Sequence, residues 1–476
     1  MPPNLADEHD ERFETPLMIS VSGVRGIVGG ALTPEIACRF AQAYGCYLSQ
    51  TLQRSNVPTF RHPKVLLARD TRRSGVMLRH AVLAGLLGTG CHVIDLGICA
   101  TPTLQLSVPF HRADGAICIT ASHNPIQWNA LKFFRPNGMY LSAELGQQLL
   151  EVYHRGKFGC CGWDGLGSLD ADGEATRRHV ERILSSVDAD AIRSKHFRVV
   201  IDCCNGAGAV ITPYLLRRLG CEVIELNCDI HSNFPHDPEP IAANLAELCA
   251  AVRRHGADVG FAHDADVDRV SIVTEQGEAL GEEYSLIFAV HFVLSRRKGA
   301  VVTNLSTSMA IDDVARQHGC TVYRTPVGEV NVAEKMRDIG AVIGGEGNGG
   351  IINPDIHLTR DGPAGLALIL NLLAESNQKV SKLAAGLPRY VIVKKQFRFP
   401  REKAPELLNA LRRAIPADSV DERDGLKFLW SDRWVHVRPS GTEPIVRVIA
   451  EAKDMATAEQ LCATAEAHLR RCTPEQ

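Results

Sequence analysis

Residues 197–224, FRVVIDCCNGAGAVITPYLLRRLGCEVI, contain one complete strand–helix–strand unit. The apolar residues 197–202 predict a buried strand, and residues 211–219 have the spacing of an amphipathic helix. Gly220 supplies the left-handed residue with which such a helix ends, and the chain then enters a second apolar strand. This order predicts two parallel strands in one sheet with a helix packed across them.

The same unit occurs twice more in the chain. The other copies are residues 64–68, 77–87 and the strand after Gly90-Cys91, and residues 300–303, 309–318 and the strand after Gly319-Cys320. Repetition on the scale of a domain predicts three similar α/β domains with mixed, mainly parallel sheets.

The pattern changes from about residue 390. A strand at 390–397, a helix at 404–415, two strands around 425–437 and a final helix at 457–471 predict a C-terminal α+β domain. The Gly-rich residues 156–173 form the first predicted linker. The predicted domains are residues 15–158, 174–278, 279–387 and 388–476, after a loose N-terminal tail at 1–14.

Length and composition exclude several classes of protein. The chain has 476 residues and a formal net charge of −3, so it has no global basic field for nucleic acid or an anionic membrane. The most apolar run, residues 364–374, is too short to cross a bilayer. The fifteen cysteines are odd in number, contain no paired Cys-x-x-Cys set and follow no export signal. We therefore expect reduced thiols and a cytoplasmic location.

The run Thr120-Ala121-Ser122-His123-Asn124-Pro125 directly follows the apolar strand 116–119. Proline biases Asn124 away from helical geometry, so a fixed loop is expected. Ser122, on a rigid loop at a strand exit and beside His123, is a candidate nucleophile or phosphate carrier. The alternative is a polar turn without chemistry, since Ser and Asn often hydrogen-bond to local backbone.

The alternating acids Asp264, Asp266 and Asp268 bring three carboxylates close together, which is costly without a cation. Their hard oxygen ligands suit Mg²⁺. A calcium EF-hand loop is disfavoured by Arg269, which stands where that loop needs glycine, and by the apolar strand 270–273 that follows. A solvated acidic turn remains the alternative.

Two further segments are typical of ligand loops. One has two hydroxyls and a glycine between two guanidinium groups, the pattern of a phosphate cradle: Arg438, Ser440, Gly441, Thr442 and Arg447. The other, residues 344–350, has five glycines that allow close approach to a ligand, with Glu346 and Asn348 suited to hydroxyl groups. Alone, each could be a plain turn or hairpin.

Two basic strand exits complete the candidates. Arg25 lies in a glycine-bracketed turn, and residues 69–75 follow a strand directly. Such a segment is more often a surface salt-bridge site than a ligand site.

Together these motifs resemble the α-D-phosphohexomutase family, which includes phosphoglucomutases, phosphomannomutases and phosphoglucosamine mutases. The resemblance runs from about residue 17 to 467, with four motifs in family order, one in each predicted domain. It implies the family's heart-shaped architecture of four domains.

The resemblance also implies roles for the residues that match. Ser122 would carry the phosphoryl group, and Ser122 with the three aspartates would bind Mg²⁺. Arg25, Lys132 and His123 would lie at the reacting group, with Lys132 as a proposed acid/base. The substrate would contact Arg269, Glu346, Asn348, Arg438, Ser440, Gly441, Thr442 and Arg447.

The implied activity interconverts hexose 6-phosphate and hexose 1-phosphate, with Mg²⁺ as cofactor and a hexose 1,6-bisphosphate as intermediate. Sugar phosphates would be the partners of a monomer or homodimer. The alternatives are a metal-dependent sugar-phosphate phosphatase and a sugar-phosphate-binding protein without catalysis.

The chain departs from the commoner family pattern in residues 344–350, which we call the sugar loop. Many members have Glu-x-Ser-Gly-His, whereas this chain has Asn348 and Gly350 at the Ser and His positions. His357, Lys132 or a water would then take the proton-transfer role. This variant resembles the phosphoglucosamine mutase branch, with phosphoglucomutase and phosphomannomutase as the alternatives.

Overall fold

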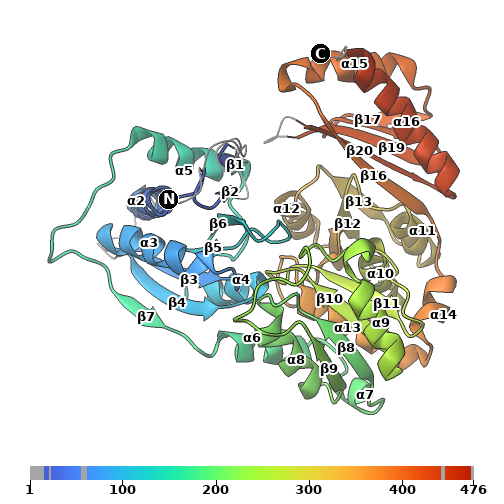
Figure 1. The fold of residues 1–476 in the computed structure, drawn as a ribbon, viewed down its shortest axis with the longest axis horizontal. Helices are drawn as coiled ribbons and strands as arrows, with labels where there is room; N and C mark the ends of the chain where they lie inside the picture. Colours follow the sequence, from blue (N-terminus) through green and yellow to red (C-terminus); the bar gives the residue numbers. More distant parts are fainter. Residues whose placement is uncertain (1–15, 21–22, 55–61, 441–444, 473–476) are drawn as a thin grey trace, which may run out of the picture.

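The computed structural model describes residues 16–20, 23–54, 62–440 and 445–472. These residues form four sheets, and Figure 1 shows that the sheets follow one another around an arc in chain order. We name the bodies built on them domains I to IV.

Domain I contains a seven-stranded sheet in the order β1-β2-β6-β5-β3-β4-β7. Its strands are β1 (Met18–Ser20), β2 (Gly23–Ile27), β3 (Lys64–Arg69), β4 (His92–Ile98), β5 (Gly115–Ile119), β6 (Trp128–Phe134) and β7 (Leu169–Ala171). Its helices are α2 (Pro34–Arg54), α3 (Ser74–Gly88), α4 (Thr101–Phe110) and α5 (Ala143–Arg155). The predicted linker thus contributes β7, which pairs in parallel with β4 at the edge of the sheet.

Helices cover both faces of this sheet. Val65 and Leu67 of β3 pack with residues of α2, α3 and α5, whereas Leu66 and Ala68 pack with residues of α4. Successive side chains of a strand point to opposite faces, so burial on both sides requires an apolar residue at each position. This explains the uninterrupted apolar run in residues 65–68.

Domains II and III each contain a four-stranded sheet, and their helices pack around a shared core. Domain II contains β8 (Arg198–Asp202), β9 (Glu222–Leu226), β10 (Val259–His263), β11 (Val270–Thr274), α6 (Ala175–Leu184), α7 (Ala189–Arg193), α8 (Gly208–Arg218), the short 3-10 helix η1 (Ala242–Asn244) and α9 (Ala246–His255). Domain III contains β12 (Val301–Asn304), β13 (Val322–Thr325), β14 (Ile343–Glu346), β15 (Gly350–Ile352), α10 (Glu283–Arg296), α11 (Ala310–Gln317), α12 (Glu329–Ile339), α13 (Gly362–Ser376) and α14 (Val380–Ala385).

The first three domains share one strand topology. Each of the three sets of four strands, β3–β6, β8–β11 and β12–β15, has the same arrangement. The first strand of the set lies between the second and the third and is parallel to both. The fourth strand is antiparallel to the third. The predicted repetition is therefore confirmed. The connection between the third and fourth strands contains Ser122 in domain I, the three aspartates in domain II and Asn348 in domain III.

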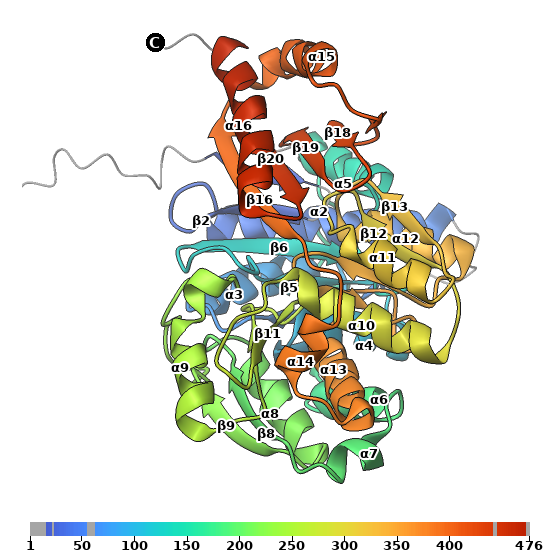
Figure 2. The same cartoon turned by 90° about the vertical axis from the view of Figure 1, so that its right-hand side faces the viewer.

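Domain IV is an antiparallel sheet in the order β16-β20-β19-β18-β17, covered by helices, and Figure 2 shows α16 lying across it. Its elements are β16 (Val391–Arg398), the 3-10 helix η2 (Arg401–Lys403), α15 (Ala404–Ala414), β17 (Ser419–Asp421), β18 (Leu426–Leu429), β19 (Trp434–Pro439), β20 (Ile445–Ala452) and α16 (Met455–Cys472). The sequence interpretation omitted β20 and placed Arg438 and Arg447 on one loop. This was wrong, because the alternating residues 445–452 form a strand on which Arg447 pairs with Arg438 of β19.

Domain IV has its own apolar core, separate from the core that domains II and III share. Among the described residues, no helix is both long enough and apolar enough to span a membrane.

Candidate active site

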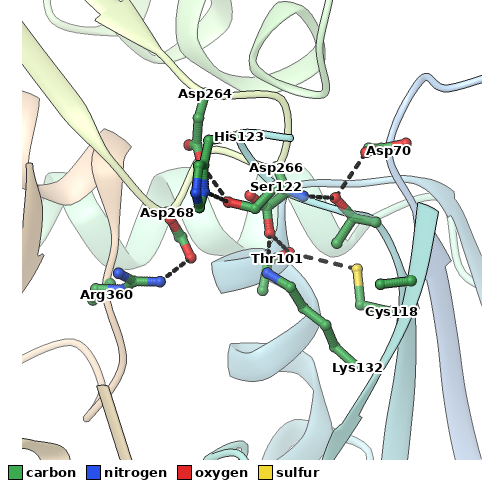
Figure 3. Close-up of polar contacts among 12 residues, drawn as sticks. Asp70, Thr101, Cys118, Ser122, His123, Lys132, Asp264, Asp266, Asp268 and Arg360 are labelled. Atoms are coloured by element: carbon green, nitrogen blue, oxygen red, sulfur yellow. Dashed lines mark hydrogen bonds and ion pairs between the residues drawn. The ribbon is translucent and has the colours of Figure 1, made fainter. Parts of the chain in front are cut away.

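Ser122 lies in the connection between β5 and β6, where its backbone adopts the left-handed φ of 52°. Its hydroxyl donates a hydrogen bond to Oδ2 of Asp264 at 2.7 Å, across the boundary between domains I and II (Figure 3). Its own N–H donates to Oγ1 of Thr120 at 3.0 Å. The loop therefore presents the serine hydroxyl to the acidic loop of the next domain.

Arg72 binds the backbone of this loop. Its guanidinium lies in the protein interior and donates to four carbonyl oxygens of the loop, those of Ser122 (2.8 Å), Asn124 (2.6 Å), Pro125 (2.7 Å) and Trp128 (3.1 Å). Its Nε donates to Asp70 at 3.0 Å. The sequence interpretation treated residues 69–75 as a surface salt-bridge site. That was wrong for Arg72, because both Arg72 and its ion-pair partner Asp70 are buried, and its other partners are backbone oxygens distant in sequence.

The three aspartates converge as predicted. Asp264, Asp266 and Asp268, between β10 and β11, are buried and each offers an oxygen within 4.8 Å of the others. Within the described residues, Oδ1 of Asp266 and Oδ1 of Asp268 are buried without a hydrogen-bond partner. Burial, and then the carboxylates of Asp268 and Asp266, raise the pKa of Asp264 well above its usual value. A divalent cation would relieve this repulsion and bind the oxygens that accept no hydrogen bond, so the cluster fits Mg²⁺.

Lys132 supplies a buried positive charge beside the aspartates. Its Nζ donates to Oδ2 of Asp266 at 2.7 Å, and the hydroxyl of Thr101 donates to the same oxygen at 2.7 Å. Burial alone would lower the pKa of Lys132, but Asp266, Tyr140 and Asp268 together outweigh burial, and the pKa is raised well above its usual value. Lys132 is therefore a stable cation. Arg25 contacts the serine loop, residues 120–128, where its Nη1 donates to Oδ1 of Asn124 at 2.7 Å.

His123 and Arg269 lie together at the serine. Nη2 of Arg269 donates to Nδ1 of His123 at 2.9 Å, and that nitrogen is 3.4 Å from the hydroxyl oxygen of Ser122. Burial, followed by the charges of Arg269 and Arg25, lowers the pKa of His123 well below its usual value. His123 is therefore a neutral ring, and Nδ1, as the acceptor, carries no proton.

The sugar loop is joined to the aspartates by Arg360, which the sequence interpretation missed. Nη1 of Arg360 donates to Oε2 of Glu346 at 3.0 Å, and Nη2 donates to Oδ2 of Asp268 at 2.6 Å. The other oxygen of Glu346 accepts from Asn304 at 2.7 Å. Oδ1 of Asn348 accepts from the N–H of Gly350 at 3.3 Å, which closes the loop on itself.

His357 lies in a different cluster. Its Nε2 is 2.7 Å from Oδ2 of Asp361, and the buried His179 is 2.7 Å from the same oxygen. The His357 side chain therefore lies between α6 and the start of α13, and not in the hydrogen-bonded cluster around Ser122.

The predicted phosphate cradle is described only in part. Gly441 and Thr442 lie outside the described residues. Arg438, on β19, donates through Nε to Asp424 of its own domain at 2.9 Å. The N–H of Ser440 donates to the carbonyl oxygen of Ile445 at 2.8 Å.

Comparison with known proteins agrees with this geometry. Four family models match in order: phosphoglucomutase/phosphomannomutase alpha/beta/alpha domains I (residues 17–159), II (177–277) and III (281–390), and the C-terminal domain (395–468). The chain is 40% identical over 460 residues to a probable phosphoglucosamine mutase of Methanopyrus kandleri, covering 95% of this chain and 98% of the relative. It is 38% identical over 450 residues to a phosphoglucomutase/phosphomannomutase of Thermococcus kodakarensis, covering 92% and 95%.

A solved structure shows the same fold. The crystal structure of a phosphoglucomutase/phosphomannomutase family protein from Burkholderia thailandensis superimposes with a TM-score of 0.81 at 28% identity, covering 96% of this chain and 99% of that one. The four domains, the convergent serine and aspartates and these relatives together identify the chain as a member of the phosphoglucomutase/phosphomannomutase family, an isomerase of the phosphohexomutase type.

Proposed function

We propose that the chain is a cytoplasmic phosphoglucosamine mutase that interconverts glucosamine 6-phosphate and glucosamine 1-phosphate through a phosphorylated Ser122. The observation that carries this proposal is the 2.7 Å contact between the hydroxyl of Ser122 and Asp264. It supports the proposal because phosphoryl transfer requires a nucleophile beside a cation, and the buried Ser122 hydroxyl contacts a cluster of three carboxylates that fits Mg²⁺.

Asp264, Asp266, Asp268 and the oxygen of Ser122 are the groups that would hold Mg²⁺. When bound, Mg²⁺ supplies positive charge that offsets the charge of the phosphoryl oxygens. The buried oxygens of Asp266 and Asp268 that accept no hydrogen bond among the described residues support this assignment.

The protein's own cations would act on the transferred group. Lys132 and Arg269 both lie beside the aspartates: Lys132 is bonded to Asp266, and Arg269 is bonded to His123 and lies 3.7 Å from Asp268. Such fixed charges stabilise the transition state without reorganisation. Because Asp266 keeps Lys132 protonated, Lys132 would serve as a cation and proton donor rather than as a base.

The remaining residues would bind the substrate. Glu346 and Asn348 would contact sugar hydroxyls, and the phosphate not being transferred would be bound by Arg438, Ser440, Gly441, Thr442 and Arg447. Phospho-Ser122 would phosphorylate the monophosphate, and the hexose 1,6-bisphosphate would then turn so that its other phosphate returns to Ser122. Holding the remote phosphate in both orientations would keep each acceptor hydroxyl in line with the serine.

The preference for glucosamine is supported by the sugar loop and by the names of several relatives. It is tested by comparing kcat/KM for the 1-phosphates of glucosamine, glucose and mannose, each with Mg²⁺ and its own bisphosphate. The highest value is expected for glucosamine 1-phosphate, and a clear preference for glucose or mannose would overturn this choice. Release of inorganic phosphate in step with sugar consumption would indicate a phosphatase, and binding without turnover of any hexose would indicate a non-catalytic binding protein.

A further inference from the structure

Asp424 joins domain IV to domain III at a single carboxylate. It lies in the turn between β17 and β18, and Nε of Arg438 donates to its Oδ1 at 2.9 Å. Its Oδ2 accepts from the N–H of Val327, in the turn between β13 and α12, at 3.0 Å. One side chain thus contacts a residue of the proposed phosphate cradle and the backbone of the domain that contains the sugar loop.

The turn that contains Asp424 is fixed on both sides. Gly425 has a φ of 73°, and a Cβ at this position would lie 2.4 Å from the carbonyl oxygen of Val437. His436 lies 2.6 Å from the carbonyl oxygen of Asp424 through Nε2, and its Nδ1 lies 2.9 Å from the hydroxyl of Ser306 in domain III. The position of the carboxylate is therefore set by backbone geometry as well as by its own contacts.

The contact with Val327 continues into the active site. The N–H of the next residue, Gly328, donates to Oε1 of Glu346 at 3.1 Å. Glu346 in turn bonds Arg360, which bonds Asp268 at 2.6 Å. Asp424 and Glu346 therefore hold adjacent peptide N–H groups of one turn, and the path from Arg438 to the aspartates is continuous.

We propose that Asp424 is a positioning residue that orients Arg438 for the substrate phosphate and ties that arginine to the sugar loop. The inference rests on the proposed function. Because Asp424 binds Nε, the terminal amino groups are the donors that a phosphate would use. A guanidinium already held by a carboxylate loses less side-chain freedom when it binds a phosphate, so affinity gains from preorganisation.

The test is Asp424→Ala, with Asp424→Asn as the variant closest in shape. In both, we expect KM for the hexose 1-phosphate to rise by about 10-fold while kcat changes by less than about 3-fold, since the carboxylate acts on ground-state binding. Calorimetric titration with the same hexose 1-phosphate should give the same loss of affinity without relying on turnover. Asp424→Glu should recover part of the loss.

A double-mutant cycle separates positioning from general damage. In an Arg438→Ala background, Asp424→Ala should add little further loss, because its target is absent. Asp432→Ala is the matched control, since this more exposed aspartate forms its ion pair with the neighbouring Arg433, and we expect wild-type KM.

Three results would overturn the inference: unchanged affinity in Asp424→Ala, an equal loss in the presence and absence of Arg438, or a loss of kcat with unchanged KM. Failure of the proposed function has a different signature, since the wild-type chain itself would then not isomerise hexose phosphates.

Discussion

The guanidinium of Arg72 lies 2.8 Å from the carbonyl oxygen of Ser122, and three further carbonyl oxygens of the serine loop converge on the same group. A single buried side chain thus sets the backbone from which Ser122 projects. In Arg72→Lys, one ammonium cannot span these oxygens, and the serine would be displaced from Asp264. We expect kcat to fall by about 100-fold, with a much smaller change in KM. Steady-state kinetics of the isomerisation measures both.

The control for Arg72 is its neighbour. Arg73 is exposed, and Arg73→Lys should keep wild-type kcat. If Arg72→Lys also kept wild-type kcat while folding normally, Arg72 would not set the loop.

Lys132→Met should change catalysis and metal affinity in opposite directions. Loss of the cation beside Asp266 should lower kcat by about 100-fold or more, as for other catalytic acids. The same change removes a positive charge that competes with Mg²⁺ for Asp266, so the dissociation constant of Mg²⁺ should decrease several-fold. Calorimetric titration with Mg²⁺ measures this constant, and Lys298→Met, at an exposed position, is the control. Weaker Mg²⁺ binding in Lys132→Met would contradict the assignment of Asp266 as a ligand.

Stability below neutral pH should depend on His436. Burial lowers the pKa of this ring to about 4, whereas an unfolded histidine has a pKa near 6.5. Between these values the unfolded chain binds more protons, so the free energy of unfolding falls as the pH falls from 6.5 to 4. The free energy of unfolding that this group removes approaches about 3 kcal/mol near pH 4.

In His436→Gln this part of the pH dependence should disappear. Urea unfolding of domain IV at several pH values measures it, with the exposed His154→Gln as control. Identical pH profiles for wild type and His436→Gln would show that the ring is not buried as a neutral base.

Glu283 should make the stability depend on pH in the opposite direction. Burial raises its pKa to about 8, compared with an unfolded value near 4.5. The folded chain therefore holds the extra proton between these values, and stability falls as the pH rises from 4.5 towards 8. Glu283→Gln should unfold at a higher temperature than the wild type at pH 9, and the difference should shrink towards pH 5. Glu406→Gln, exposed on α15, should show no such trend, and a variant less stable than wild type at pH 9 would contradict the prediction.

Much of the fold could be predicted because it repeats. The strand, helix and Gly-Cys signals at residues 64–94, 197–224 and 300–323 correspond to three copies of one topology. The serine loop and the aspartates were identified because each set is continuous in sequence and chemically unusual. The matching hairpins that carry them could not be read from local patterns, since sheet order depends on contacts between distant strands.

The missed residues share a physical reason. Arg72 bonds carbonyl oxygens that lie 50 or more residues away, and Arg360 bonds Asp268 of another domain, so neither arginine gives a local signal in the sequence. The strand β20 was missed because the segment from Arg438 to Arg447 was interpreted as one ligand loop. The predicted roles of Gly441 and Thr442 stay predictions.

The central claim is that Ser122 carries the phosphoryl group, and peptide mapping by mass spectrometry tests it most directly. The chain is incubated with a hexose 1,6-bisphosphate and Mg²⁺, and the phosphorylated residue is located after digestion. The account predicts one phosphoryl group on Ser122, and loss of both this group and mutase turnover in Ser122→Ala. Phosphorylation at another residue, or near wild-type turnover in Ser122→Ala, would contradict it.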